Sequence, residues 1–266
     1  MGSEMTDEHE GSAADDAGYW ARVLPPLMQR QRPPRFAVLG LLIITVALCA
    51  LPDVSAAERT HDKHQERKAC PTQKAQSFLI RSNFVKRGTL SPAAHEQALR
   101  YRAEQYGNIE DQGLERYNRQ RAYASAVGVR FMGLPLQIHK KVVPALRCVE
   151  RYIERTCTGA QERYKPQAVG GFRQANTYRG GEVSNHLFGI AIDIDPNRNP
   201  CCGCVAPWRD HPGCRKPSET VFERAALTRC WIDGFERFGF YWLGRDPELR
   251  DTMHFEFLGN PELLAP

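Results

Sequence analysis

One stretch of the chain combines a histidine with two carboxylates in a pattern typical of a metal site. Residues 184–195 read SNHLFGIAIDID. From the first isoleucine onward, apolar side chains alternate with small or acidic ones, which predicts a strand with one apolar face and one face carrying Asp193 and Asp195. His186 precedes this strand, and Gly189 lets the chain bend between His186 and Asp193. A histidine and a carboxylate that converge in this way are half of a zinc site.

A second segment, residues 251–257 with the sequence DTMHFEF, supplies another candidate ligand. Its polar and apolar residues again alternate, which places His254 on the polar face of a further strand. Two imidazoles and one carboxylate form a donor set that catalytic zinc sites use while one position stays open for water. Asp251 has the wrong parity to share this face. We therefore expect it in a turn or bulge before the strand, from where it would act as a general base.

The residue pattern alone leaves other interpretations open. A single histidine beside a strand is usually structural or exposed, and the two acids of residues 184–195 could form a solvated face. A calcium site is a further possibility, although calcium would require more oxygen ligands in one loop. Acids on an otherwise apolar strand need partners when they are buried, which favours a metal site.

The elements that must position these residues indicate an α+β fold class, with helices beside a small, mostly antiparallel sheet that carries the metal site. Helices are expected at 91–126, starting with a Ser-Pro cap, and at 140–157, where Pro144 must lie in the first turn. Thr220 and Glu223 could form a capping box for a third helix that ends near Gly239. The expected strands are two within 127–139, around a turn at 133–135, and four at 167–173, 189–195, 240–243 and 252–257.

The amino-terminal region predicts export. Residues 36–51 (FAVLGLLIITVALCAL) are uncharged and mostly apolar, with three arginines at 30–35 before them and small residues at 54–57 after them. This order describes a secretory signal within residues 1–57. The apolar run is shorter than the roughly 20 residues of a comfortable membrane span. We therefore expect that the segment is cleaved and that the protein is periplasmic or extracellular. An uncleaved segment would instead anchor the protein to the membrane.

Cysteine content agrees with export. Eight of the nine cysteines follow the apolar stretch, and an even number in an oxidising compartment predicts disulfides whose pairing the sequence leaves open. The alternative is a structural zinc cluster, although the spacing matches no standard finger. Its ligands would be Cys201, Cys202, Cys204, His211 and Cys214.

Composition sets broad limits. Hydrophobic residues make up 42% of the chain and charged residues 25%, which excludes wholesale disorder. The net charge of +5 divides into −3 for residues 1–57 and +8 for the remainder. A basic mature protein favours anionic surroundings such as cell-wall polymers or nucleic acid, and export disfavours nucleic acid.

The two chemical segments resemble the zinc D-alanyl-D-alanine carboxypeptidase-like metallopeptidases, a VanY-type group that includes L-alanyl-D-glutamate endopeptidases and phage endolysins. Its pattern Ser-x-His-x-x-Gly-x-Ala-x-Asp is matched without exception at 184–193. Its later acid-x-x-His is matched by Asp251 and His254, and its upstream Gly-aromatic-Arg by residues 171–173. Asp251, in place of Glu, resembles the endopeptidase and endolysin branch. The resemblance covers about residues 127–266.

This resemblance implies a D-Ala-D-Ala carboxypeptidase/hedgehog-like fold with Zn²⁺ held by His186, Asp193 and His254. It implies Asp251 as the general acid and base, and Arg173 as the group that holds the scissile carbonyl or a substrate carboxylate. The alternative for Arg173 is an ordinary surface ion pair. The implied activity is hydrolysis of peptide bonds in peptidoglycan stem peptides, most readily as an endopeptidase.

Further roles follow from the same comparison. Asp195 and Glu256 are expected to support the ligand histidines, and Trp242 either lines the cleft or belongs to the core. Residues 127–266 would form the zinc peptidase domain, after a linker and helical extension at 58–126. The proline- and cysteine-rich insertion at 196–217 departs from the family pattern and is expected to rim the cleft.

Two other functions compete with the endopeptidase. One is a D-Ala-D-Ala carboxypeptidase of the same family. The other is a non-catalytic domain that binds the cell wall on the same fold, which an intact Asp251 beside intact ligands argues against. The sequence does not indicate an oligomeric state.

Overall fold

The computed structural model describes residues 70–266 except 179–180, 205–207, 216, 218–219 and 265–266. These residues lie within one compact unit. The expected export segment, with its apolar stretch at 36–51, lies outside them. No helix in the described part of the chain is long and apolar enough to cross a bilayer.

A four-stranded antiparallel sheet lies at the centre of the fold, in the order β5-β6-β8-β7. Its strands are β5 (Val169–Gly170), β6 (Ala191–Ile194), β7 (Phe240–Trp242) and β8 (His254–Phe257). The expected alternation is present, because Ile192 faces Phe255 across β6 and β8 on the apolar face while Asp193 faces His254 on the other. Both faces of β6 and β8 are buried.

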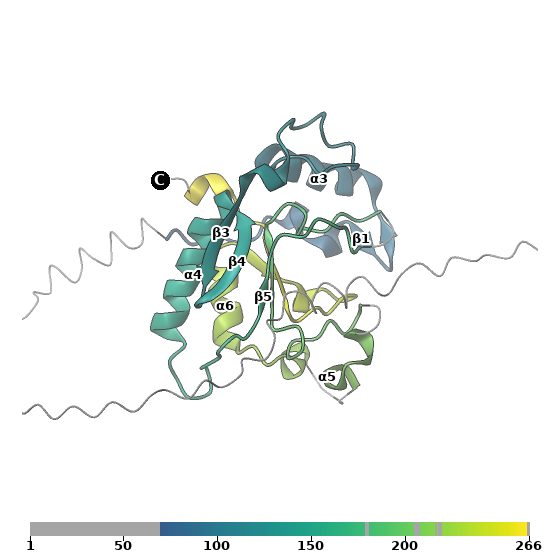
Figure 1. Cartoon of the computed structure of the whole chain (residues 1–266). Coiled ribbons are helices and arrows are strands. Elements are labelled where there is room, and N and C mark those ends of the chain that lie inside the picture. Colours follow the sequence, from purple (N-terminus) through teal and green to yellow (C-terminus); the bar gives the residue numbers. More distant parts are fainter. Residues whose placement is uncertain (1–69, 179–180, 205–207, 216, 218–219, 265–266) are drawn as a thin grey trace, which may run out of the picture. The chain divides into compact units, whose positions relative to one another are not determined.

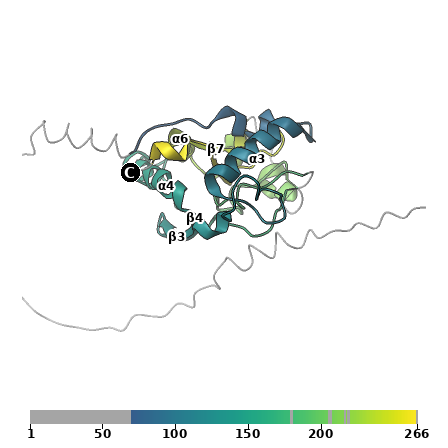
Figure 2. The ribbon, with the colours of Figure 1, turned by 90° about the horizontal axis from the view of Figure 1, so that it is seen from above.

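Helices α4 (Val143–Thr156) and α6 (Arg229–Arg237) cover the apolar face. In α4, Leu146, Val149 and Ile153 are buried at helical spacing. In α6, Phe235 stacks on Phe255 of the sheet, with ring centroids 4.1 Å apart. Figures 1 and 2 show α4 and α6 together on the left of both views and α3 (Pro92–Tyr106) on the right.

The remaining strands form two hairpins, β1 (Val85–Lys86) with β2 (Thr89–Leu90) and β3 (Ala126–Phe131) with β4 (Leu134–His139). The described part also contains a four-residue helix, α5 (Pro212–Arg215), and short 3₁₀ turns. These turns are η1 (Ser77–Leu79), η2 (Arg81–Asn83), η3 (Ala122–Ser125), η4 (Lys140–Val142), η5 (Trp208–Asp210), η6 (Val221–Arg224), η7 (Leu243–Arg245) and η8 (Pro261–Leu264).

The segment before residue 127 shares the core with the residues after it. Leu99, Ala103 and Tyr106 of α3 belong to the main apolar cluster, together with residues of α4, α6 and the sheet. A second cluster joins Leu79, Phe84, Val85 and Ala98 to Leu258, beyond the end of β8. The expected start of the peptidase domain at residue 127 stays a prediction, and the core extends across it.

The α+β class is confirmed, and several element boundaries are corrected. The helix expected at 91–126 ends at Tyr106. Gly107 has φ +107, and a Cβ there would lie 2.6 Å from the backbone nitrogen of Ala122, so the chain must turn at this glycine. The β3–β4 turn consists of Met132 and Gly133, both with positive φ, and the two residues after them belong to β4.

The capping box expected at Thr220 and Glu223 is wrong. Thr220 makes no side-chain cap hydrogen bond, and only the 3₁₀ turn η6 follows it. Helix α6 instead begins after Thr228, whose hydroxyl accepts a hydrogen bond from the backbone N–H of Trp231. Pro144 lies in the first turn of α4, as expected.

All eight cysteines in the described residues form disulfides. The pairs are Cys70–Cys148, Cys157–Cys230, Cys201–Cys204 and Cys202–Cys214. The alternative of a zinc cluster within 201–214 is therefore wrong, because its four cysteine sulfurs are bonded to each other.

Replacing both Cys157 and Cys230 with Ala should lower the free energy of unfolding by about 2–4 kcal/mol. These cysteines lie 73 residues apart, so their bond restricts a long loop of the unfolded chain. Urea denaturation without reductant measures the loss. The Cys201–Cys204 pair, only 3 residues apart, is the control and should give a smaller loss; equal losses would contradict this explanation.

Candidate metal centre

His186 is held by a turn and by one backbone carbonyl. The backbone N–H of Leu187 donates to the carbonyl of Ser184, and that of Gly189 donates to the carbonyl of His186. The ring Nδ1 of His186 lies 2.6 Å from the carbonyl oxygen of Gly171. Because a carbonyl only accepts, Nδ1 carries the proton and Nε2 presents a lone pair.

Gly189 is required at the end of this turn. Its φ is +67, and a Cβ there would overlap with the ring of Phe172. Its carbonyl accepts a hydrogen bond from the backbone N–H of His139, at the end of β4. Residue 189 therefore joins the histidine turn to β4, and the bend expected there is confirmed.

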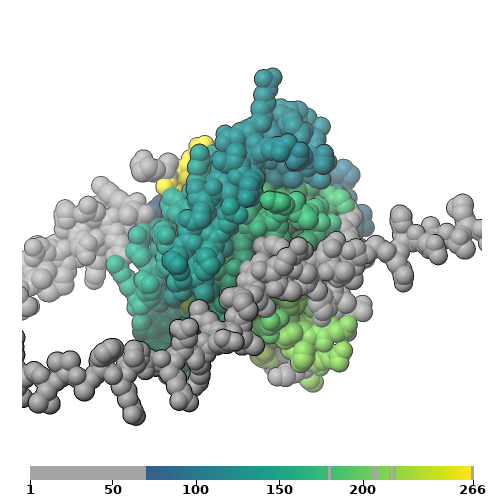
Figure 3. Space-filling view, in the orientation of Figure 1, coloured from purple at the N-terminus to yellow at the C-terminus, as the bar shows by residue number. Residues whose placement is uncertain are grey.

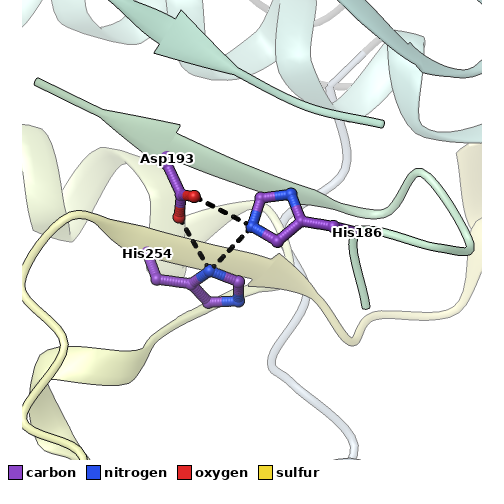
Figure 4. Close-up of side chains that lie close together, drawn as sticks. All are labelled: His186, Asp193 and His254. Atoms are coloured by element: carbon purple, nitrogen blue, oxygen red, sulfur yellow. Dashed lines mark hydrogen bonds and ion pairs between the residues drawn. The ribbon is translucent and has the colours of Figure 1, made fainter. Parts of the chain in front are cut away.

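Asp193 and His254 face each other directly across β6 and β8. Figure 4 shows their side chains and that of His186 pointing toward one another. Asp193 Oδ1 lies 2.8 Å from His254 Nδ1, and Asp193 Oδ2 lies 3.0 Å from His186 Nε2. The two ring nitrogens are 3.1 Å apart. All three side chains are at most 4% exposed.

This donor set fits a tetrahedral metal ion. Zinc bonds of about 2.0–2.1 Å place neighbouring ligand atoms about 3.3 Å apart. The contacts between each pair of these side chains are shorter than this by only a few tenths of an ångström. The imidazole planes of His186 and His254 are inclined by 71°, so the two rings approach the common point from different directions. The hydrogen bond from His186 Nδ1 to the carbonyl of Gly171 already fixes the tautomer that a ligand histidine needs.

The protonation of these three side chains depends on burial and on their charged neighbours. Burial, followed by the charge of Arg173, lowers the pKa of His186 to about 4, so this imidazole is neutral at neutral pH. Burial alone would raise the pKa of Asp193, but the charge of Arg173 and the hydrogen bond from His254 hold it well below its usual range. Burial alone would lower the pKa of His254, but its hydrogen bond to Asp193 raises it. A neutral imidazole and an ionised carboxylate are the states that bind a cation.

Arg173 lies at the edge of this cluster. Its guanidinium contacts the carboxylate of Asp193, and Nη1 donates to Thr177 Oγ1 at 3.3 Å. Its backbone N–H donates to the carbonyl of His186. The interpretation as an ordinary surface ion pair is wrong, since Asp193 is buried. The resemblance implies that Arg173 holds the scissile carbonyl or a substrate carboxylate, and this role stays a prediction.

Asp251 precedes the turn of Thr252 and Met253 that leads into β8, so it lies outside the strand, as its parity indicates. Its side chain is buried, and a backbone N–H at Met253 donates to its carboxylate. Burial raises the pKa of Asp251 to about 7, with a further contribution from the charge of Asp193. Asp251 Oδ1 and His254 Nε2 are buried atoms with no hydrogen-bond partner among the described residues. The site thus contains a carboxyl group that titrates near neutral pH.

The structure corrects two expectations about neighbouring residues, Asp195 and Glu256, and decides between the two alternatives for Trp242. Asp195 follows β6 with φ +43 and accepts hydrogen bonds from the backbone N–H groups of Gln167 and Ala168, not from the histidines. Glu256 accepts from the side-chain amide of Asn185. Trp242 is fully buried, and its indole N–H donates to the carbonyl of Thr252. It belongs to the core.

Sequence reasoning missed Asn185 and the carbonyl of Gly171. Asn185 is the unspecified residue of the Ser-x-His pattern, and it pairs with Glu256, two positions after His254. A signal was available, since Glu256 shares a face with His254 and a buried acid there needs a donor. The contact between Gly171 and His186 had no signal, because a backbone carbonyl looks the same at every position.

The Cys201–Cys204 disulfide lies against Asp251. One ligand-type atom of each of these three residues lies within 4.8 Å of the others. The backbone of Cys201 pairs with that of Asp251 as an isolated antiparallel bridge. The insertion at 196–217 therefore contacts the candidate general base, in line with its expected place beside the site.

One comparison with known proteins found a match for the part of the chain that carries this site. Residues 177–257 match the family described as D-alanyl-D-alanine carboxypeptidase. The resemblance to this family is confirmed. The match spans His186, Asp193, Asp251 and His254 and supports a peptidase function related to peptidoglycan. The endolysin branch stays a prediction. Searches of curated proteins and of solved structures gave no match.

The raised pKa of Asp251 predicts a pH-dependent stability for the metal-free protein. An Asp in an unfolded chain titrates near about 3.9, so between this value and about 7 the folded protein binds more protons and loses stability as pH rises. Asp251→Asn removes this loss. At pH 8 the chelator-treated variant should be more stable than the wild type by about 1 kcal/mol or more, and the difference should vanish below pH 4.

Urea denaturation at several pH values tests this expectation. Asp233→Asn is the matched control, because Asp233 has a half-exposed side chain paired with Arg229. A stability difference for Asp251→Asn that does not change with pH would contradict the shifted titration.

Proposed function

We propose that this protein is a zinc peptidase that hydrolyses peptide bonds in the stem peptides of peptidoglycan, with Zn²⁺ held by His186 Nε2, Asp193 and His254 Nδ1. The observation that carries the proposal is the convergence of these three buried side chains, whose nearest nitrogen and oxygen atoms lie 2.8 to 3.1 Å apart in each pair. The family match over residues 177–257 supports the substrate class.

The chain's own groups divide the remaining chemistry. Bound Zn²⁺ supplies Lewis-acid activation of the attacking water and of the scissile carbonyl. Asp251 takes a proton from the water and delivers it to the leaving amine. Its pKa near 7 suits both steps, and a nearby cation would lower this value. Arg173 offsets the negative charge that develops on the carbonyl oxygen.

Within this activity we favour cleavage inside the stem peptide. Asp251 occupies the acid position in the manner of the endopeptidase branch. Removal of a terminal D-alanine is the second candidate, because the matched family is described as a carboxypeptidase and a carboxypeptidase needs a cation for the free carboxylate. Arg173 is a cation at the site, and it already contacts Asp193.

The disulfides and the family match suggest an exported protein. We propose that residues 1–57 direct it to the periplasm or the exterior, where peptidoglycan peptides are its partners. Contact with a membrane would then occur only through an uncleaved apolar segment at 36–51, and nucleic acid is not an expected partner.

The purified protein should bind one zinc ion, and His186→Ala should weaken binding by at least about tenfold. Competition with a chromogenic chelator measures the affinity. His211→Ala is the matched control, because His211 contacts the carbonyl of Asn197 in the cysteine-rich insertion and should leave the affinity unchanged. Loss of zinc from the His211 variant alone would refute the assignment.

Asp251→Asn should retain zinc and lower kcat by about 10²–10⁴-fold, since it removes general acid–base catalysis. In the zinc-loaded wild type, kcat/KM should rise with pH and level off below the metal-free pKa of about 7, because Asp251 must be deprotonated to accept a proton and bound zinc lowers its pKa.

Mass spectrometry of muropeptides digested by the zinc-loaded protein identifies the bond. Release of one D-alanine indicates the carboxypeptidase, and larger fragments indicate the endopeptidase. If the zinc-loaded wild type leaves every muropeptide intact, the peptidase proposal fails and a non-catalytic wall-binding domain takes its place.

A further inference from the structure

Arg81, in the 3₁₀ turn η2, is a buried cation that connects two loops of the site. Its Nε and Nη2 atoms donate to the two carboxylate oxygens of Glu182 at 2.7 and 2.8 Å. Its Nη1 donates to Asp246 Oδ1 at 3.2 Å. Figure 3 shows the blue amino-terminal part of the described chain lying against the green residues of its middle. Arg81 lies before residue 177, where the family match begins.

Glu182 introduces the loop that carries His186. The backbone carbonyl of Glu182 accepts a hydrogen bond from the Asn176 side chain at 2.7 Å, and the same side chain accepts from the backbone N–H of Ser184 at 3.1 Å. The turn that holds His186 begins at Ser184. A shift of Glu182 would therefore also move the turn that holds His186.

Asp246 organises the loop that ends at Asp251. Its Oδ1 accepts hydrogen bonds from the backbone N–H groups of Glu248 and Leu249, at 3.0 and 2.9 Å. Its backbone carbonyl accepts a hydrogen bond from the backbone N–H of Arg250. This is a tight turn built around one carboxylate. Any change in the direction of the Asp246 side chain would alter the path of the chain into Asp251.

The electrostatics of the cluster require Arg81. The side chain of Asp246 is fully buried and that of Glu182 is 14% exposed. Buried carboxylates need a paired cation, and a guanidinium can donate to both at once because its donors form a planar fork. Burial alone would lower the pKa of Arg81, but hydrogen bonds and charge from Glu182 raise it, so Arg81 stays charged. Without this cation, the carboxylates of Glu182 and Asp246 would repel each other.

We propose that Arg81 is a positioning residue for the reaction. By pairing with Glu182 and Asp246 together, it fixes the loop of His186 relative to the loop of Asp251. This inference rests on the proposed peptidase function, and it assigns to the segment before residue 127 a role in the site.

The test compares Arg81→Met, which keeps the length of the side chain but removes the charge, with Arg116→Met. Arg116 lies in the same segment and forms an exposed ion pair with Glu96, so it serves as the matched control. Hydrogen exchange followed by mass spectrometry should show at least tenfold faster exchange at residues 182–189 and 246–251 in Arg81→Met, while exchange in α4 stays within about twofold of the wild type. Arg116→Met should match the wild type throughout.

Kinetics on the muropeptide that the wild type cleaves provide the second readout. For Arg81→Met we expect kcat to fall by about 10–100-fold with KM within about threefold, because the catalytic groups are misplaced while the substrate surface remains. Glu182→Gln is a milder variant that removes only the Arg81–Glu182 ion pair. If Arg81→Met does not fold, both measurements are made on Glu182→Gln instead.

The outcomes separate the inference from the function on which it rests. Faster exchange confined to the two loops, with a loss in kcat, supports the positioning role. Unchanged exchange, or faster exchange spread evenly over α4 and the sheet, overturns it. An inactive wild type refutes the peptidase proposal, and positioning for catalysis falls with it, while the exchange pattern still decides whether Arg81 orders the loops.

Discussion

Asp193 is an ionised carboxylate buried on the polar face of the central sheet, and the structure around it is arranged to satisfy this one charge. Strand pairing sets His254 directly opposite, with its Nδ1 2.8 Å from Asp193 Oδ1, and the guanidinium of Arg173 contacts the other carboxylate oxygen. A buried charge without such partners would cost several kcal/mol. Because the buried charge of Asp193 needs partners, the fold brings together a cluster of donor atoms that can bind a cation.

Parity along the strands predicted much of this cluster. Once Asp193 and His254 were each placed on the polar face of a strand, pairing of β6 with β8 was sufficient to bring them together, and the bend at Gly189 followed from its lack of a side chain. The sequence could not show that Asp195 leaves the strand with positive φ and faces a different loop. Parity holds only while the strand continues, and the point where β6 ends depends on contacts with residues 164–168.

Local signals failed where a distant contact decides the conformation. The helix expected to reach residue 126 stops at Gly107, which packs against residues 120–122. The cap expected at Thr220 is at Thr228 instead, and helical propensity gives no reason to prefer one threonine over the other. Arg81 carried no sequence signal at all, because its partners Glu182 and Asp246 lie about 100 and 165 residues further along the chain.

The pairing of the insertion's cysteines has a practical consequence. Cys201 and Cys202 are neighbours in sequence but bond to different partners, Cys204 and Cys214. A register error of one residue during oxidation would exchange these partners and redirect the strand bridge to Asp251, yet leave His186, Asp193 and His254 untouched. Mispaired bonds within 201–214 would therefore disturb the backbone beside Asp251 without involving the three clustered side chains. Production of this protein calls for a thiol–disulfide shuffling system, and the disulfide pairing itself has to be checked.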